Sequence, residues 1–356
     1  MREDAFVNIF SKIAWDFGLL KNDLVKSVGS KFSTANQNII ITKELEAAPT
    51  TLYLMQYLPG GCQANCAFCV QGTSSTREKK SSYLVANQLI RYPLQTIIRF
   101  LQNKDLPFKR ICIQTVLHYE AMDDLLNLVI ELKKNTDIPI TADCTPITKD
   151  EIIKLHDAGL DRITINYELS TPTLFNKIRG EGRNSPYRWE LTTRSLDDAL
   201  QIFGSSRVLS HLIVGIGETD REALCHIDYL LKKKIVPSLL AFRPLEGTDL
   251  AELRRITHAR FHSLQIAAFL IRNNLDDLES MKFDEDGSLR SPSITKEQLI
   301  DIIYSGRCFT TSGCPSCNRP NYTVDPGERH YTYPKIPSQK QLAIIEHEIC
   351  KRWHLL

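Results

Sequence analysis

The sequence lacks an excess of charge of either sign. Its 356 residues include 44 lysines and arginines against 42 aspartates and glutamates, and no basic run suggests a surface that follows a phosphate backbone. We therefore expect no nucleic acid as a partner. The chain is longer than a usual single domain, but an α/β barrel with appended segments often reaches this length.

Long apolar runs are also missing. No stretch approaches the ~20 apolar residues that a membrane-spanning helix needs. The N-terminal stretch MREDAFVNIFSKIAWDFG has neither the apolar core nor the small-residue cleavage site of a signal peptide. We also find no duplicated repeat and no low-complexity segment. These features predict a cytoplasmic protein without a membrane partner.

Cysteine, in contrast, is abundant. A cytoplasmic compartment keeps thiols reduced, so the ten cysteines indicate metal ligands or buried apolar side chains rather than disulfides. Six lie in two close groups, Cys62/Cys66/Cys69 and Cys308/Cys314/Cys317. The four that stand alone are expected to behave as small hydrophobic residues; they are Cys112, Cys144, Cys225 and Cys350.

Apolar runs alternate with helical patterns along most of the chain. The runs predict six buried strands, at 51–58, 110–117, 138–147, 161–169, 207–216 and 236–245. Amphipathic patterns between them predict helices, such as AMDDLLNLVIELKKN at 121–135 and TKDEIIKLHDAGL at 148–160, where Gly159 ends the helix. Strands that alternate with helices form right-handed βαβ units and a parallel sheet. With weaker candidates at 280–285 and 307–311, the prediction is an α/β barrel of six to eight parallel strands.

Three segments follow from this pattern. Residues 1–50 are interpreted as a mostly helical lead-in, 51–305 as the barrel, and 306–356 as a Cys-rich extension that ends in a helix. The chemistry of a parallel barrel sits at the C-terminal ends of its strands, and the first cysteine group directly follows the first strand. Because a closed barrel brings its last strand beside its first, we expect the second cysteine group at the same mouth.

The first cysteine group, GGCQANCAFC at 60–69, allows two interpretations. A structural zinc site needs a fourth Cys or His, and the next histidine, His118, is about fifty residues away. An iron–sulfur cluster held by three cysteines leaves one iron open to a small molecule. The spacing C-x3-C-x2-C, with Phe68 before the last cysteine and a strand before the loop, resembles the radical S-adenosylmethionine (SAM) superfamily.

This resemblance implies a TIM-type (β/α) barrel in which Cys62, Cys66 and Cys69 bind a 4Fe–4S cluster. The open iron would chelate the amino and carboxylate groups of SAM. Reduction then gives a 5′-deoxyadenosyl radical that abstracts hydrogen from an unactivated carbon. The three cysteines are therefore both catalytic and metal-binding candidates, and an electron donor such as ferredoxin is implied.

Several segments resemble SAM-binding segments of the superfamily. INYELSTP at 165–172 resembles a biotin synthase segment that contacts the ribose and the substrate, and HLIVGIGET at 211–219 resembles an adenine-contact pattern in which His211 replaces the first glycine. After the second strand, Gln114 and Thr115 stand where many members hold the SAM amino group. The cofactor contacts implied are Phe68, Gln114, Thr115, Asn166, Glu168, Ser170, Arg188, Val214, Gly215 and Glu218.

Four charged residues have more specific expected roles. Arg188 is a candidate partner of the SAM carboxylate. Arg243 points either into the barrel towards a carboxylate or to a salt bridge at the rim. Glu168 either contacts the ribose or belongs to a charge pair at the rim, and Glu218 is expected to organise its turn.

The second cysteine group, RCFTTSGCPSCNRP at 307–320, has the spacing C-x5-C-x2-C. A zinc ribbon is the alternative, but His330 is thirteen residues beyond Cys317 and no other fourth ligand lies at the usual spacing. Together with the barrel motifs, TSGCPSCNRP resembles the two-component, archaeal-type lipoyl synthases over residues 51–330. The fourth ligand stays open among Ser312, Ser316, Asn318 and Arg307.

That resemblance implies an auxiliary 4Fe–4S cluster on Cys308, Cys314 and Cys317, which is sacrificed as the sulfur source for a protein-bound octanoyl chain. The implied partners are an octanoylated lipoyl carrier protein (an H protein or an E2 domain) and a paralogous radical SAM subunit. Three alternatives stay open. A biotin-synthase-like enzyme would act on a small free molecule with a cluster deep in the barrel, a methylthiolase or maturase would carry a similar pair of clusters, and a structural protein would hold zinc.

Overall fold

The computed structural model describes residues 6–10, 47, 50–78, 83–84, 87–102, 106–318 and 328–355. Its centre is a nine-stranded sheet with the order β3-β4-β1-β2-β5-β6-β7-β8-β9. Neighbouring strands from β2 to β9 are parallel. They are β2 (Thr51–Gln56), β5 (Arg110–Gln114), β6 (Ile140–Cys144), β7 (Arg162–Ile165), β8 (Val208–Val214) and β9 (Val236–Ala241). All six predicted strands are confirmed.

Three antiparallel strands extend the sheet beyond β2. β1 (Phe6–Phe10) pairs with β2 and with β4 (Asn87–Pro93), and β3 (Tyr83–Leu84) pairs with β4. The prediction of a mostly helical lead-in was wrong for residues 6–10, and the rest of 1–50 lies outside the described residues except for positions 47 and 50. Because β1 occupies the edge of β2, β9 does not pair with β2, and the described strands form an open, partial barrel.

The two weaker strand candidates do not belong to the barrel. β10 (Lys282–Phe283) pairs with β11 (Leu289–Ser291) in a separate antiparallel sheet, and residues Arg307–Phe309 form a 3-10 helix, η4. The parallel strands of the described chain therefore number six, the lower end of the predicted range.

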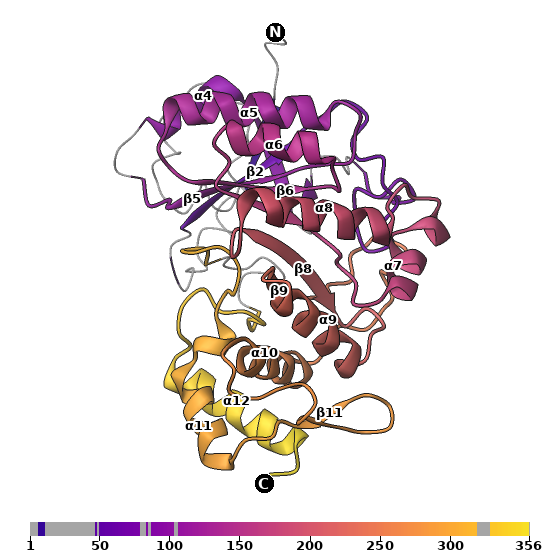
Figure 1. Cartoon of the computed structure of the whole chain (residues 1–356), viewed down its shortest axis with the longest axis vertical. Helices are drawn as coiled ribbons and strands as arrows, with labels where there is room; N and C mark the ends of the chain where they lie inside the picture. Colours follow the sequence, from indigo (N-terminus) through magenta and orange to yellow (C-terminus); the bar gives the residue numbers. More distant parts are fainter. Residues whose placement is uncertain are drawn as a thin grey trace, which may run out of the picture.

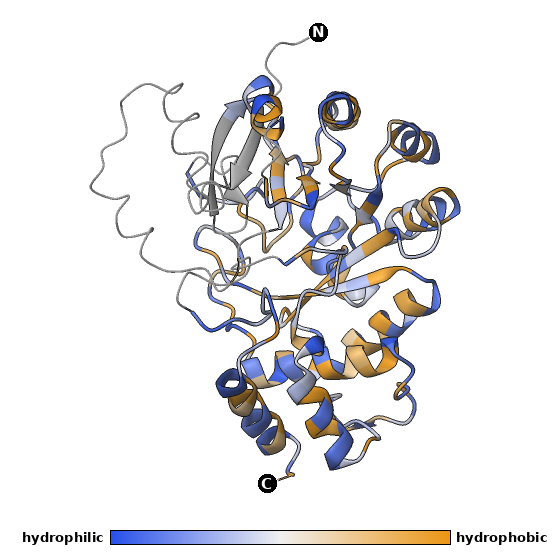
Figure 2. Ribbon diagram, turned by 90° about the vertical axis from the view of Figure 1, so that its left-hand side faces the viewer, coloured by the Kyte–Doolittle hydropathy of each residue, from blue (hydrophilic) through white to orange (hydrophobic). Residues whose placement is uncertain are grey.

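Helices connect the parallel strands and cover the outer face of the sheet (Figure 1). The connecting helices are α4 (Leu94–Leu101), α5 (Ala121–Asn135), α6 (Lys149–Asp157), α7 (Pro172–Ile178), η3 (Glu181–Arg183), α8 (Trp189–Phe203) and α9 (Asp220–Lys232). Beyond β9 pack α10 (His258–Arg272), α11 (Lys296–Ser305) and α12 (Gln339–Arg352). The helices carry hydrophilic residues outward and apolar residues towards the interior (Figure 2). Within the described residues we find no helix with the length and apolar character to span a membrane.

Local sequence determines where several helices begin and end. Thr148 and Glu151 form a capping box at the start of α6, and Thr219 and Glu222 form another at the start of α9. Gly159, with φ of +92°, follows α6 and lets the chain turn towards β7. The helix end predicted at this glycine is confirmed.

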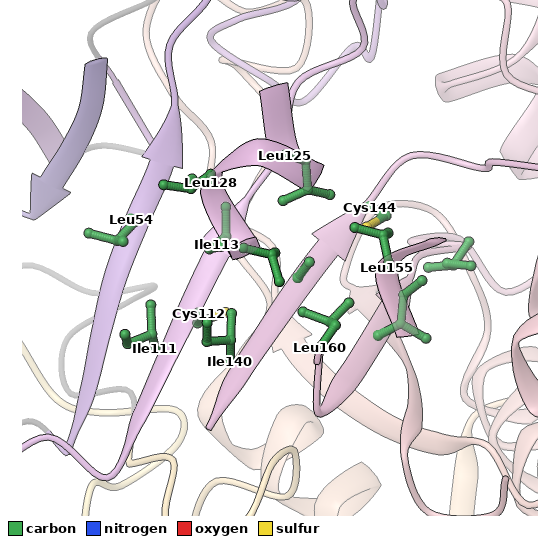
Figure 3. Close-up of a cluster of buried hydrophobic side chains, with 14 of the residues drawn as sticks. Leu54, Ile111, Cys112, Ile113, Leu125, Leu128, Ile140, Cys144, Leu155 and Leu160 are labelled. Atoms are coloured by element: carbon green, nitrogen blue, oxygen red, sulfur yellow. The ribbon is translucent and has the colours of Figure 1, made fainter. Parts of the chain in front are cut away.

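Side chains on the parallel strands alternate between an outer and a concave face. On β5, Ile111 and Ile113 are fully buried in the core between the sheet and its helices (Figure 3). Arg110, Cys112 and Gln114 alternate with them and line a cavity on the opposite face. The strand is therefore apolar towards the helices and polar towards the barrel interior.

A buried carboxylate joins the C-terminal elements to the barrel. Asp220, at the start of α9, has a side chain that is only 1% exposed. It accepts hydrogen bonds from Arg260 of α10 and Arg352 of α12, each at 2.7 Å, and from the backbone N–H of Leu289 in β11 at 2.9 Å. One carboxylate thus holds three separate elements.

We expect Asp220→Ala to lower the free energy of unfolding by about 3 kcal/mol, because it leaves Arg352 without its carboxylate partner and a buried amide unpaired. Chemical denaturation of both proteins measures the difference. Asp197→Ala, which removes a half-exposed partner of Lys233, is the control and should leave the midpoint nearly unchanged. Equal effects of the two substitutions would contradict the central role of Asp220.

Candidate functional site

The first cysteine group lies at the C-terminal ends of the parallel strands, as predicted. Cys62, Cys66 and Cys69 are half-buried and line a cavity of about 210 Å³. The backbone N–H of Ala67 donates to the carbonyl of Ile178 at 2.9 Å, which ties the loop to the end of α7. The three thiols therefore have a fixed position beside the cavity.

A glycine allows the loop to fold this tightly. A Cβ atom on Gly72 would lie 2.9 Å from the backbone oxygen of Cys66 and 3.1 Å from that of Cys69. Real Cβ atoms rarely approach so closely, so a larger residue would push the loop out of shape.

The thiols of Cys66 and Cys69 lie where charge is costly. Burial raises the pKa of Cys69 to about 11, and burial also raises the pKa of Cys66. A bound metal centre would supply positive charge and so favour the thiolate forms. Soft thiolate donors without a fourth ligand at the spacing of a zinc site suit an iron–sulfur cluster.

Within the described part of the chain, the first cysteine group does not form a site for a single metal ion. Among the described residues, no three His, Cys, Asp or Glu side chains converge closely enough to hold a single metal ion. A 4Fe–4S cluster does not need such convergence, because each thiolate binds a different iron atom. Cys62, Cys66 and Cys69 therefore fit the cluster that the sequence predicts.

Five of the residues predicted to contact the cofactor line the same cavity: Phe68, Gln114, Thr115, Asn166 and Glu168. The roles of these residues towards SAM stay predictions, but the structure brings them together with the three cysteines. Arg243 also lines this cavity, which agrees with the first of its two predicted orientations, the one into the barrel.

A polar network fixes the floor of the cavity. The Asn166 side chain donates to Oδ1 of Asp143 at 2.7 Å and accepts from the backbone N–H of His211 at 2.8 Å. Nδ1 of His211 lies 3.7 Å from Oδ2 of Asp143, and the Thr115 hydroxyl donates to the Asp143 carbonyl at 2.9 Å. These bonds link residues of β6 and β8 with the residues that directly follow β5 and β7. Asp143 was not predicted as a site residue, because no motif marks it.

Glu168 has an unusual backbone conformation. Its φ is +64°, in the left-handed region that residues other than glycine rarely adopt. Two backbone hydrogen bonds to β8, with His211 and Ile213, hold it there. Its carboxylate contributes to raising the pKa values of Cys66 and Cys69, after the larger effect of burial. Such strain is typical of functional sites.

Sequence reasoning missed Arg179, which is the buried cation of the cavity. This residue follows α7 and is 5% exposed. It donates to the carbonyls of Asn166 at 2.5 Å and Tyr167 at 3.3 Å, and its guanidinium carbon lies 3.9 Å from the centre of the Tyr187 ring. Burial opposes its charge, but Tyr187, Cys66 and Glu168 raise its pKa above the ordinary value. Arg179 therefore stays charged beside the cysteines.

Arg188, the predicted partner of the SAM carboxylate, is not among the residues that line this cavity. Its Nε lies 2.9 Å from a carboxylate oxygen of Glu181. Its guanidinium also donates to the carbonyls of Ser185 and Tyr187, both at 2.8 Å. The sequence offered no distinction between Arg179 and Arg188, because neither belongs to a strict motif.

Four further predicted contacts lie outside the cavity lining, namely Ser170, Val214, Gly215 and Glu218. Glu218 does organise its turn, since its carboxylate accepts from the N–H groups of Gly215 at 2.6 Å and Ile216 at 2.9 Å. A Cβ atom on Gly215 would lie 2.6 Å from Cβ of Ile256. Packing alone therefore requires glycine at this position.

The second cysteine group does not lie at the same mouth. The hydroxyl of Tyr53 is 3.1 Å from Sγ of Cys317, and the hydroxyl of Thr141 is 3.5 Å from Sγ of Cys314. The Asn318 side chain accepts from the N–H of Thr50, just before β2. The tail thus reaches the amino-terminal ends of the strands. The expectation of a shared mouth was wrong, because the barrel does not close through a strand beside this tail.

Cys308 lies apart from Cys314 and Cys317. It is buried and lines a separate cavity of about 220 Å³ together with Gln265, Arg272 and His330. Of the candidates for the fourth ligand, Ser312 and Arg307 line this separate cavity, whereas Asn318 and the backbone carbonyl of Ser316 bond to Thr50. The structure therefore places Cys308 apart from Cys314 and Cys317, although their spacing in the sequence had suggested one group.

Two cavities on the concave side of the sheet share lining residues. The inner one, about 20 Å³, is lined by Cys314 and Cys317. Gln114 and His211 line this cavity and also the mouth cavity that holds the first cysteine group. Gln114 and His211 therefore lie at the boundary of both cavities.

Comparisons with known proteins agree with this geometry. A family model described as the radical SAM superfamily matches residues 57–230. A biotin synthase of Chlamydia pneumoniae is 22% identical over 225 residues, 60% of this chain and 62% of that protein. A biotin synthase of Streptococcus agalactiae is 27% identical over 227 residues, 61% of this chain and 62% of that protein. The chain thus spans less than two thirds of the length of these relatives.

A solved structure shows the same fold. The crystal structure of methylornithine synthase matches with a TM-score of 0.50 and 15% sequence identity, over 63% of each chain. The partial barrel of parallel strands is therefore shared with a known enzyme.

We expect Arg179→Gln to weaken SAM binding about tenfold or more, because a charge-assisted hydrogen bond contributes ~1.5–3 kcal/mol. Arg188→Gln, which changes an arginine outside the cavity lining, should leave SAM affinity unchanged. Equilibrium binding of SAM to both reconstituted proteins measures this, with iron content as the check that the cluster is retained. The reverse order of effects would restore Arg188 as the SAM contact.

Glu168→Ala should also weaken SAM binding without removing iron, because it deletes a hydrogen-bond acceptor that lines the cavity. Ser170→Ala is the matched control, since Ser170 lies two residues away but outside the lining. Isothermal titration of both variants measures the affinity. Unchanged affinity in Glu168→Ala would assign this carboxylate to the rim charge pair instead.

Proposed function

Because this chain belongs to the radical SAM superfamily, we propose that it inserts sulfur into a protein-bound octanoyl chain, as one subunit of a lipoyl synthase. It is a radical SAM enzyme, and its superfamily uses a 4Fe–4S cluster and SAM. Cys62, Cys66 and Cys69 would hold the cluster, which when bound supplies the electron for reductive cleavage of SAM. The proposal adds a second 4Fe–4S cluster as the sulfur source.

One observation carries the proposal. The two sets of thiols lie at opposite ends of the barrel interior, and Gln114 and His211 line both cavities between them. Replacing C–H by C–S requires a radical at carbon and a sulfur atom within reach before the radical is quenched. A carbon placed between the two ends would have the radical source on one side and sulfur on the other.

The lining of the mouth cavity suits an acyl chain. Its apolar side chains include Met55, Leu117, Ile213, Leu240, Phe242 and Leu245. They would bind methylene groups and exclude water, which would otherwise compete in reactions at the barrel interior. Arg179 and Arg243 line the same cavity and would bind carboxylate groups there.

A sulfur insertion of this kind requires protein partners. An octanoylated lipoyl carrier protein, either an H protein or an E2 domain, would dock at the mouth so that its acyl chain enters the cavity. A paralogous radical SAM subunit would share the two sulfur insertions, and a donor such as ferredoxin would supply electrons. These partners would meet the enzyme in the cytoplasm.

A biotin-synthase-like activity on a small free molecule is the second candidate. The position of Cys314 and Cys317 inside the barrel favours it, since a cluster deep in the barrel was the feature expected of such an enzyme. The similarity to biotin synthases supports the same candidate activity.

The deciding experiment offers both substrates to anaerobically reconstituted protein with SAM and a reductant. We expect about eight irons per chain if both clusters are 4Fe–4S, formation of 5′-deoxyadenosine, and a thiolated product from an octanoyl-lysyl peptide or octanoylated carrier protein, by mass spectrometry. The reaction is run with and without the paralogue. Sulfur in a small free molecule of the biotin type, but not in octanoyl substrates, would favour the second candidate, and stoichiometric zinc without iron would refute both.

A tail variant separates sulfur insertion from radical formation. Changing Cys308, Cys314 and Cys317 together to Ala should leave SAM cleavage intact, because the ligands of the first cluster lie elsewhere in the chain. The variant should form 5′-deoxyadenosine but no thiolated chain, whereas the unchanged protein should stop after about one turnover unless sulfur is restored. A variant that still thiolates its substrate would show that the tail does not supply the sulfur.

A further inference from the structure

We propose that Cys112, Cys314 and Cys317 supply the thiolates of the inner cluster site, and that Cys308 does not. The inference rests on the proposed function, because it assigns the ligands of the second cluster. It replaces the set that the spacing of the tail cysteines suggests, and it gives a role to a strand cysteine that stands alone in the sequence.

Strand register places Cys112 between the two contacts of the tail. In the parallel sheet, Cys112 of β5 is paired with Tyr53 of β2 on one side and with Thr141 of β6 on the other. The Tyr53 hydroxyl is 3.1 Å from Sγ of Cys317, and the Thr141 hydroxyl is 3.5 Å from Sγ of Cys314. Each neighbour of Cys112 in the sheet therefore touches one tail thiol.

The cavities separate the candidates in the same way. Cys112, Cys314 and Cys317 all line the inner cavity, and Cys308 does not. Cys308 lines the other cavity, whose lining includes none of those three cysteines. Cys112, Cys314 and Cys317 therefore share one cavity, and Cys308 lines a different one.

Cys308 is held in its place by a packed core. It belongs to η4, and with Phe309 it packs among apolar residues of α10, α11 and α12. The carbonyl of Phe309 accepts a hydrogen bond from the N–H of Tyr333 at 2.8 Å, and Thr310 forms a β-bridge with Tyr333. Moving Cys308 to the inner cavity would disrupt this packing.

Unsatisfied polar atoms around the inner cavity indicate a missing ligand. Arg110 is 5% exposed and Thr51 is 1% exposed, and both line the cavity. Among the described residues, Nε of Arg110 and the hydroxyl of Thr51 have no hydrogen-bond partner. Buried polar groups without partners are rare and costly. The sulfides and thiolates of a cluster would accept hydrogen bonds from both groups.

The charge of the cavity favours the same ligand. An iron–sulfur cluster with three thiolates is negatively charged, and the buried side chain of Arg110 lines the same cavity as Cys314 and Cys317. The guanidinium of Arg110 is oriented by the Thr141 hydroxyl at 2.8 Å and by Asp161 at 2.7 Å. A fixed cation thus lies beside the thiols.

The tail is the part that would adjust to the cluster. The inner cavity measures about 20 Å³, which is room for about one water molecule. Residues 311–318 belong to no helix or strand, so this loop would move outward with Cys314 and Cys317 and would release the contacts of Ser316 and Asn318 with Thr50. Cys112 would not move, because β5 is paired on both sides.

The test removes the first cluster, so that the inner site is the only one measured. In a background with Cys62, Cys66 and Cys69 changed to Ala, reconstituted protein should bind about four irons. Adding Cys112→Ser should lower this to below about one iron, whereas adding Cys308→Ser should leave it unchanged. Cys350→Ser is the matched control, because Cys350 is also buried but lies in α12. The measurements are iron and sulfide content, with Mössbauer spectra to identify the cluster.

Each outcome has one meaning. Loss of iron in Cys308→Ser, with or without loss in Cys112→Ser, would overturn the ligand assignment, and so would retention of iron in Cys112→Ser. A far-ultraviolet circular dichroism spectrum shows that each variant is folded. A background protein that binds no iron at all would instead refute the second cluster, and with it the proposed sulfur source.

Discussion

The alternation of side chains along parallel strands is the constraint on which the rest of this structure depends. One face of each strand must be apolar, because the connecting helices cover it, as Ile111 and Ile113 of β5 show. Helices cannot cover the concave face in the same way. Polar residues such as Arg110 and Gln114 therefore accumulate there, and they can persist only if hydrogen bonds or ligands satisfy them.

An open barrel gives this concave face two ends with different access. β1 occupies the edge of β2, so β9 does not close the sheet. The loop after β2 brings one set of thiols to the carboxyl ends of the strands, and the tail brings another to the amino ends. The strands between them hold the two sets apart, and the sequence distance between the sets has little influence on their separation in space.

The sequence predicted what depends on local patterns. Six strands, the helix at 121–135 and the position of the first cysteine loop follow from periodicity and spacing, and all are present. The antiparallel strand at Phe6–Phe10 was missed because its partners, β2 and β4, are distant in sequence. Arg179 was missed for a related reason, since only the folded chain shows that it lines the cavity and that Arg188 does not. Long-range pairing, rather than local propensity, decided each of these errors.

Spacing alone misleads for the tail cysteines for the same physical reason. Closely spaced cysteines predict a shared metal when the backbone between them is a free loop. Here the bridge between Thr310 and Tyr333 fixes the chain just after Cys308, while the contacts of Asn318 and Ser316 with Thr50 fix it just after Cys314 and Cys317. The short connection must then span two anchored ends, and its thiols face different cavities. Strand register, rather than distance along the chain, determines which side chains meet. Cys112 can therefore act together with Cys314 and Cys317, whereas Cys308, six positions before Cys314, does not.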